Sequence, residues 1–114
     1  MLLTKKFRFE AAHNLTDYNG DCENLHGHSY KLEVTIKGSV KENGFVKDFK
    51  EIERMVEENV VGKLDHSYLN ETVKLSTCEN LAKWIFNEIR HILPVHEIKL
   101  YETEDSWVTY NGDE

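Results

Sequence analysis

The residues whose types could do chemistry begin with two histidines in Cys22-Glu23-Asn24-Leu25-His26-Gly27-His28. Apolar and polar residues alternate in the run that follows, over 29–37, and this period of two predicts a β-strand. Residues two apart on a strand point to the same face, so His26 and His28 lie side by side on the apolar face. Two imidazoles turned inward together are good ligands for a metal ion. The segment therefore predicts a metal site where a strand begins.

A third histidine, His13, ends an earlier predicted strand over residues 3–13. The connecting segment is rich in Asp, Asn and Gly, which is typical of a loop or a wide hairpin connection. If the two strands pair antiparallel, the end of the first meets the start of the second, and His13 lies beside His26 and His28. Three neutral imidazoles suit Zn²⁺ and leave its fourth position open, which is the pattern of a catalytic zinc site.

Cys22 admits three interpretations. It could be a fourth zinc ligand that closes a structural site, or a thiolate acid/base beside an open site, since a nearby metal and imidazoles lower a thiol's pKa. It could also be a buried structural cysteine. Spacing alone does not separate these interpretations.

Three further positions carry weaker signals. Asp65-His66 places a carboxylate next to an imidazole in a predicted loop, an arrangement that can orient the ring and support acid/base chemistry. Glu102 follows Ile98 and Leu100 on the inward face of a predicted strand, where a carboxylate either reaches solvent or binds a ligand. A pterin or guanine edge would pair with it through two hydrogen bonds. Thr77 is first of all the expected cap of a helix.

The elements that must position these residues follow the order β-β-α-α-β-β. After the two strands, Asp48 predicts a helix start, with Glu51 bonding back to it as in a capping box and Gly62 ending the helix. A second helix begins at Ser76 or Thr77 and stops before Pro94. Two short strands, 96–103 and 107–110, complete an α+β fold: a four-stranded antiparallel sheet with two helices on one face. The polar opposite face can meet water, or a wet lumen if several sheets join into a barrel.

Length and charge restrict the possible functions. The chain has 114 residues and a net charge of −7, so we expect one domain over 1–114 and no nucleic-acid surface, because phosphate binding needs a basic stripe. We also expect no signal peptide, no membrane span and a cytoplasmic location. Without export, the two cysteines are expected to be free thiols.

Six motifs in register resemble the 6-pyruvoyltetrahydropterin synthase / 6-carboxytetrahydropterin synthase family over nearly the whole chain. They are Phe9-Glu10-Ala11-Ala12-His13, Cys22-x-x-x-His26-Gly27-His28-Ser29-Tyr30, Gly44-Phe45-Val46-x-Asp48-Phe49, Leu64-Asp65-His66-x-x-Leu69-Asn70, Ser76-Thr77-x-Glu79-Asn80 and Tyr101-Glu102-Thr103. No single motif would be specific, but the ordered set is.

The resemblance implies a tunnelling fold (T-fold), in which subunits join as trimeric barrels, two trimers stack as a homohexamer, and active sites lie between subunits. It implies a pterin substrate, 7,8-dihydroneopterin triphosphate. It also implies roles for individual residues: zinc ligands His13, His26 and His28; a catalytic thiol at Cys22; an acid/base pair Asp65 and His66 from a neighbouring subunit; and a pterin anchor at Glu102 aided by the backbone around Thr77 and Cys78.

Three residues stand between Cys22 and His26, which looks like the 6-carboxytetrahydropterin synthase branch of the family, the early queuosine and deazapurine pathway. The implied reaction releases acetaldehyde and triphosphate. The enzyme alternative is the 6-pyruvoyl activity, in biopterin or folate-related metabolism. The non-enzyme alternative is a structural zinc or pterin-binding domain. Cys78 departs from the family pattern, where Thr or Ser is usual, and this departure puts the side-chain contact at that position in doubt.

Overall fold

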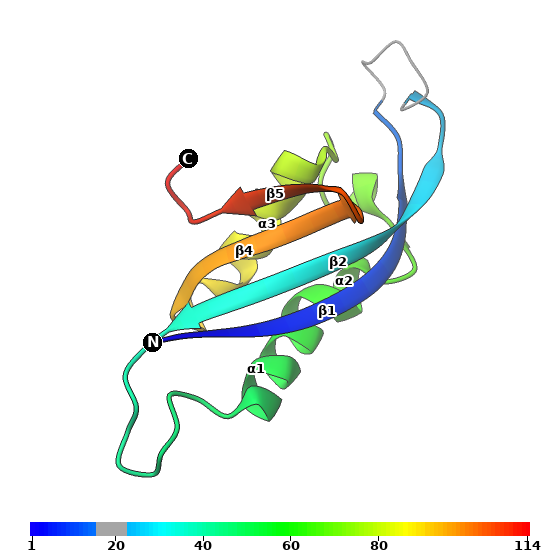
Figure 1. The fold of residues 1–114 in the computed structure, drawn as a ribbon. Coiled ribbons are helices and arrows are strands. Elements are labelled where there is room, and N and C mark those ends of the chain that lie inside the picture. The colour runs from blue at the N-terminus through cyan, green and yellow to red at the C-terminus, as the bar shows by residue number, and fades with distance from the viewer. Residues whose placement is uncertain (16–22) are drawn as a thin grey trace.

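The computed structural model describes residues 1–15 and 23–114, and its main elements follow the expected order, with one short additional strand between the two helical regions (Figure 1). The strands are β1 (Leu2–His13), β2 (His26–Lys37), β3 (Ser67–Tyr68), β4 (Val95–Thr103) and β5 (Ser106–Tyr110). The helical elements are α1 (Phe49–Val56), the π-helical turn η2 (Glu57–Val61), α2 (Gly62–Leu64), the 3₁₀ turn η3 (Leu69–Glu71) and α3 (Cys78–Ile89).

The sheet has the order β3-β1-β2-β4-β5. β1 and β2 pair antiparallel along their whole length, with His13 opposite His26, as the hairpin argument predicts. The prediction of a four-stranded antiparallel sheet needs one correction: β3 adds a fifth, parallel strand beside Ala11 and Ala12. Two residues are too few to show a period of two, so the sequence pattern does not reveal β3. The sheet of one chain is open, and a barrel made by several chains stays a prediction.

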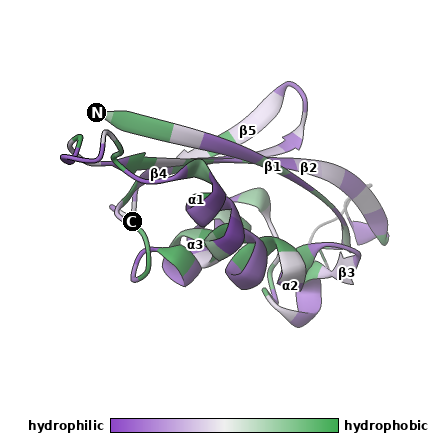
Figure 2. Ribbon diagram, turned by 90° about the horizontal axis from the view of Figure 1, so that it is seen from below, coloured by the Kyte–Doolittle hydropathy of each residue, from purple (hydrophilic) through white to green (hydrophobic). Residues whose placement is uncertain are grey.

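The helices cover one face of the sheet, as expected (Figure 2). The apolar positions of the strands and helices meet there in one core, because alternate strand residues and one stripe of each helix face the same interior. Its fully buried large side chains are Phe9, Tyr30, Leu32, Ile36, Ile52, Leu64, Leu69, Leu81, Ile85, Ile89, Ile98 and Leu100. No helix in the described part of the chain has the length and apolar character needed to cross a bilayer.

The first helical region departs from its prediction at both ends. Asp48 caps α1 by accepting the N–H of Lys50, but the Glu51 carboxylate pairs with Arg54 at 2.7 Å and does not bond back to Asp48. Gly62 does not end the helix either, since the chain stays helical through Leu64. A side chain at Gly62 would place its Cβ 2.9 Å from the carbonyl oxygen of Glu57. The glycine therefore allows close backbone packing in the π turn.

The second helix begins with Thr77, whose hydroxyl accepts the N–H of Asn80 at 3.1 Å. Thr77 is therefore the N-cap, one of the two predicted candidates. This cap places Ser76 and Cys78 beneath the end of the sheet where the histidines lie, and both are buried.

Candidate metal centre and substrate pocket

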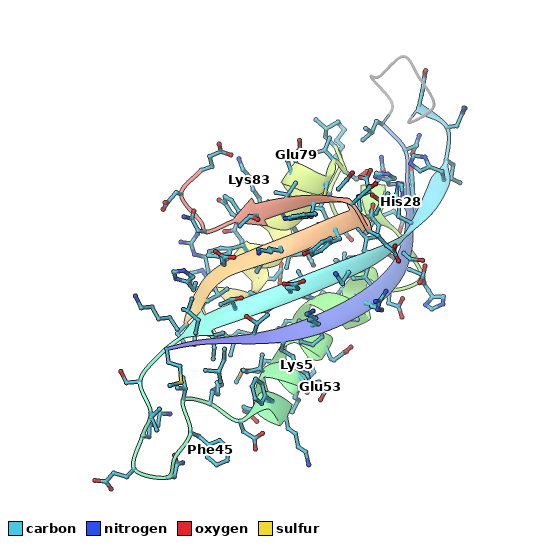
Figure 3. All side chains as sticks on the ribbon, viewed as in Figure 1. Lys5, His28, Phe45, Glu53, Glu79 and Lys83 are labelled. Carbon is cyan, nitrogen blue, oxygen red and sulfur yellow. The ribbon has the colours of Figure 1, made fainter. Side chains whose placement is uncertain are left out.

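The structure brings together the three histidines predicted from the sequence. Each of His13, His26 and His28 offers one ring nitrogen, and these nitrogens lie within 4.8 Å of one another. His13 is 1% exposed, and the other two are half-buried. The antiparallel register causes this convergence: it sets His13 opposite His26, and the two-residue strand repeat adds His28. Figure 3 shows His28 near the turn between β4 and β5.

Backbone carbonyls fix the tautomers of two of these rings. His13 Nδ1 lies 2.7 Å from the carbonyl oxygen of Ser76, and His26 Nδ1 lies 2.7 Å from that of Asn24. A carbonyl oxygen only accepts, so each Nδ1 must carry the proton and donate it. In the neutral rings, each Nε2 then bears a lone pair. This carbonyl-held tautomer is typical of histidines that bind a metal through Nε2.

The two Nε2 atoms, on His13 and His26, face one another at 3.0 Å. Two lone pairs at this distance repel unless a proton or a metal cation lies close to both. His28 adds a third unsatisfied donor atom, because its buried Nε2 has no hydrogen-bond partner among the described residues. Three convergent imidazole nitrogens, two of them with lone pairs fixed by the tautomer, fit a borderline-soft cation such as Zn²⁺. The donor chemistry thus fits the predicted metal.

The surroundings of His28 also favour the neutral, metal-binding form. Burial lowers its pKa, and the nearby rings of His13 and His26 lower the pKa further, while the Glu102 carboxylate opposes the shift. A Glu102 oxygen lies 3.7 Å from His28 Nε2, and its side chain is 31% exposed. The structure therefore brings Glu102 to the edge of the histidine group.

Glu102 also lines a small pocket of about 220 Å³ next to this group. Val108 of β5 supplies apolar surface, Trp107 borders the pocket from the same strand, and Cys78 and Glu79 come from the start of α3. A partly exposed carboxylate beside apolar surface suits a flat, polar-edged ring, whose edge could pair with the carboxylate. The Trp107 indole lies on the other face of the sheet, where it packs against Tyr101 with ring centroids 4.9 Å apart. Sequence reasoning missed Val108, which the pairing of β4 with β5 sets opposite Leu100 and so brings to the pocket.

The Cys78 thiol is used in a hydrogen bond within the protein. Its Sγ lies 3.4 Å from the carbonyl oxygen of Leu100 and donates to it. Burial raises the pKa of Cys78 to about 12, with Glu102 and Glu79 adding to the shift, so the group is a thiol at neutral pH. Burial and Glu102 likewise raise the pKa of Tyr30, whose buried hydroxyl has no partner among the described residues. The apolar pattern around Tyr30 gave no sign of this free hydroxyl.

Asp65 and His66 form a separate pair that is not part of the histidine group. His66 Nδ1 lies 3.1 Å from Asp65 Oδ2, and the His66 side chain is 80% exposed. The Asp65 carboxylate accepts the N–H of Glu10 at 2.9 Å, and this bond lowers the pKa of Asp65. His66 adopts a left-handed backbone conformation, φ 57°, and its N–H donates to the carbonyl of Glu10. With Glu10 and Ser29 it lines a depression of about 420 Å³.

Two predicted site residues, Cys22 and Thr77, are not placed in the site by their side chains. Cys22 lies outside the described residues, so the choice among a zinc ligand, a catalytic thiolate and a buried structural cysteine stays open. Thr77 uses its hydroxyl as the helix cap, which leaves its backbone as the group nearest to the pocket-lining Cys78.

Comparison with known proteins decides the family. The family model described as 6-pyruvoyl tetrahydropterin synthase matches residues 2–113. The chain belongs to this family. The resemblance identified from the six motifs is thereby confirmed.

Relatives in the family carry two different names. A protein from Archaeoglobus fulgidus, named as a putative 6-carboxy-5,6,7,8-tetrahydropterin synthase, is 42% identical over 94% of this chain and 92% of its own length. A 6-pyruvoyl tetrahydrobiopterin synthase from Dictyostelium discoideum is 34% identical over 99% of this chain and 97% of its own. A 6-carboxy-5,6,7,8-tetrahydropterin synthase from Haemophilus influenzae is 31% identical over 95% and 96%.

The fold agrees with a solved structure of the same family. The 6-pyruvoyl tetrahydropterin synthase of Caenorhabditis elegans superposes with a TM-score of 0.89, over 99% of this chain and 96% of that one, at 24% identity. The predicted α+β T-fold of the subunit is therefore confirmed.

Proposed function

We propose that this protein is a zinc-dependent 6-carboxy-5,6,7,8-tetrahydropterin synthase of queuosine and deazapurine biosynthesis. It would act on 7,8-dihydroneopterin triphosphate and release acetaldehyde and triphosphate. The observation that carries the proposal is the group of three convergent histidine nitrogens beside Glu102. Relatives named for the 6-carboxy product, in Archaeoglobus fulgidus and Haemophilus influenzae, support the choice of branch. So does the short spacing from Cys22 to His26.

In this proposal His13, His26 and His28 hold the ion through ring nitrogens. When bound, zinc would polarise oxygens of the substrate side chain, which makes protons on the neighbouring carbons more acidic. The two carbonyl-held rings keep their lone pairs aimed at one point, so little reorganisation is needed when the ion binds.

Glu102 orients the substrate ring. Its carboxylate can accept two parallel hydrogen bonds from an amino-and-imino edge, and Val108 supplies adjoining apolar surface. Because Glu102 is also close to His28, a ring held there extends its side chain towards the histidines. Backbone groups around Thr77 and Cys78 assist in the anchoring.

Cys22, Asp65 and His66 are assigned the proton transfers. A thiol and an imidazole both have pKa values close enough to neutrality for acid/base work. In the homohexamer that the family resemblance implies, the exposed Asp65-His66 pair would complete the site of a neighbouring subunit. The Glu10 backbone holds this pair on both sides, which keeps the imidazole in place for such a role.

Product analysis tests the branch. Purified protein loaded with zinc is incubated with 7,8-dihydroneopterin triphosphate, and acetaldehyde is measured together with the pterin product by mass spectrometry. Acetaldehyde in equal amount to 6-carboxytetrahydropterin supports the proposal. A pyruvoyl product without acetaldehyde supports the 6-pyruvoyl activity, which relatives such as that of Dictyostelium discoideum keep as the second candidate.

A Cys22→Ala variant tests the non-enzyme alternative. Loss of turnover with unchanged zinc content supports a catalytic thiol. Loss of zinc together with loss of folding would instead support a closed structural site, in which Cys22 is the fourth ligand.

A further inference from the structure

The side-chain amide of Asn70 bonds to the backbone of two residues, Asn14 and Lys74, and to the hydroxyl of Ser76, close to His13. Its Nδ2 donates to the carbonyl of Asn14 at 2.7 Å and to that of Lys74 at 3.3 Å. Its Oδ1 accepts the N–H of Asn14 at 3.2 Å and the hydroxyl of Ser76 at 2.6 Å. Carbonyls only accept and an N–H only donates, so these partners fix the orientation of the amide. Every hydrogen-bonding group of the side chain is used.

The pair of bonds to Asn14 imitates strand pairing. One amide both accepts from and donates to the backbone of a single residue, as a neighbouring strand does. The parallel pairing of β3 with β1 ends at Ala12. The two bonds from Asn70 to Asn14 continue the hydrogen bonding along this edge of the chain for two more residues. Asn14 directly follows His13, and its position sets where the histidine leaves the strand.

Ser76 connects the same amide to the ring of His13. It is fully buried, and its hydroxyl donates to Asn70 Oδ1. Its carbonyl oxygen accepts the proton of His13 Nδ1 at 2.7 Å. Asn70 therefore fixes both the backbone after His13 and the residue that selects the tautomer of its ring.

We propose that Asn70 and Ser76 are positioning residues for the metal site. They hold the His13 ring, before the ion binds, so that the lone pair of Nε2 points towards the metal position. This inference rests on the proposed zinc site but not on the identity of the pterin product. Groups that orient a metal-binding histidine from behind typically change metal affinity by about 10- to 100-fold when removed. Asn70 acts one step further away, through Ser76 and Asn14, so the lower end of that range is expected.

Zinc affinity of the purified full chain is the direct test, measured by competition with a chromophoric chelator. Asn70→Ala should bind zinc about tenfold more weakly than the unaltered protein. Asn59→Ala is the matched control, because Asn59 Nδ2 likewise donates to a backbone carbonyl, that of Met55 at 2.8 Å, in a π-helical turn. The control should keep its affinity. Asn70→Asp, which keeps the acceptor oxygen but cannot donate to Asn14, should also bind zinc more weakly and serves if the alanine variant does not fold.

A double-mutant cycle tests whether the two residues act as one unit. Ser76→Ala keeps the carbonyl that holds His13 but loses the bond to Asn70, so it too should weaken zinc binding. The double variant should bind no more weakly than Asn70→Ala, since both changes break the same connection. The visible absorption of the Co²⁺-substituted protein should change in Asn70→Ala and not in Asn59→Ala.

Unchanged zinc affinity in both Asn70 variants would refute the positioning role and leave the proposed zinc site intact. Equal losses of zinc affinity in Asn70→Ala and Asn59→Ala would have the same meaning. Fully additive losses in the cycle do the same. If the unaltered protein binds no zinc, both the positioning role and the proposed metal site are wrong. A 6-pyruvoyl product with intact zinc binding would correct the proposed reaction and leave this inference standing.

Discussion

The histidine group and the Asp65-His66 pair hold their imidazoles in opposite ways. His13 is 1% exposed, and its ring is held by a carbonyl from another element. His66 is 80% exposed at its side chain, and its contacts are with Asp65 and, through its own backbone, with Glu10. The histidine group is preorganised within a single chain, and its His13 ring is shielded from solvent. The backbone of His66 is fixed by its hydrogen bond to Glu10, but the imidazole is exposed.

From this difference we expect two half-sites. A buried set of nitrogen donors can bind an ion without help, because its ligands already converge. An exposed imidazole gains a directed partner and a dry environment only when another surface covers it. We therefore expect metal binding to be a property of each chain and catalysis to be a property of the assembly.

The largest expected effect comes from breaking the histidine group. His28→Ala removes one of three nitrogen donors, so zinc should be lost and turnover should fall by about 10³-fold or more, since a metal contributes several kcal/mol of transition-state stabilisation. Metal analysis and a turnover assay measure both. His91→Ala, at an exposed histidine, is the control and should retain zinc and activity. A His28→Ala variant that keeps full zinc content would refute the assignment of this ligand.

The Asp65-His66 pair gives a different signature. His66→Ala should retain zinc and lose about 10²-fold in kcat, the usual contribution of an acid/base group. Co-expression of differently tagged His66→Ala and His28→Ala chains should restore roughly a quarter of the unaltered activity, because random assembly pairs intact halves at that frequency. The mixed oligomer is purified through both tags. Two inactive variants that give no activity when mixed would place both halves in one chain's site.

The pH dependence of the unfolding free energy tests whether the buried Cys78 thiol is desolvated. Folding raises the pKa of Cys78 from its ordinary value of 9.0 to about 12. The unfolded chain therefore loses this proton first, so the contribution is constant below pH 9, and stability falls as pH rises from 9 towards 12. At pH 10 the unaltered protein should lose about 1 kcal/mol more than Cys78→Ala, relative to pH 7. Equal losses in urea unfolding of the two proteins would show that the thiol is not desolvated.

The smallest effects distinguish the two helix caps. Thr77→Ala and Asp48→Ala each remove one side-chain bond to a helix N-terminus and should each cost about 1 kcal/mol of unfolding free energy. Thr77 adjoins the pocket of Cys78 and Glu102, so only its variant should also raise KM. A rise in KM for Asp48→Ala as well would show that general loosening, not local geometry, controls binding.

Much of the histidine group was predictable because it depends on local rules. Alternation fixes that His26 and His28 share a face, and a hairpin brings the end of one strand to the start of the next. The same reasoning located the Thr77 and Asp48 caps, since capping involves residues two or three apart. It failed for Gly62, because the π turn that needs the glycine is set by packing, and it missed β3, which is too short to have a period.

The sequence by itself therefore determined the element order, the shared face of the histidines and, through six ordered motifs, the family. The tertiary structure decided which carbonyls hold the rings, that Val108 and Cys78 line one pocket with Glu102, and that Asn70 and Ser76 connect to His13. These contacts join residues far apart in the chain, such as Ser76 and His13 across 63 positions. Periodicity reports only the face on which a residue lies, whereas a hydrogen bond depends on distances that packing of the whole core sets.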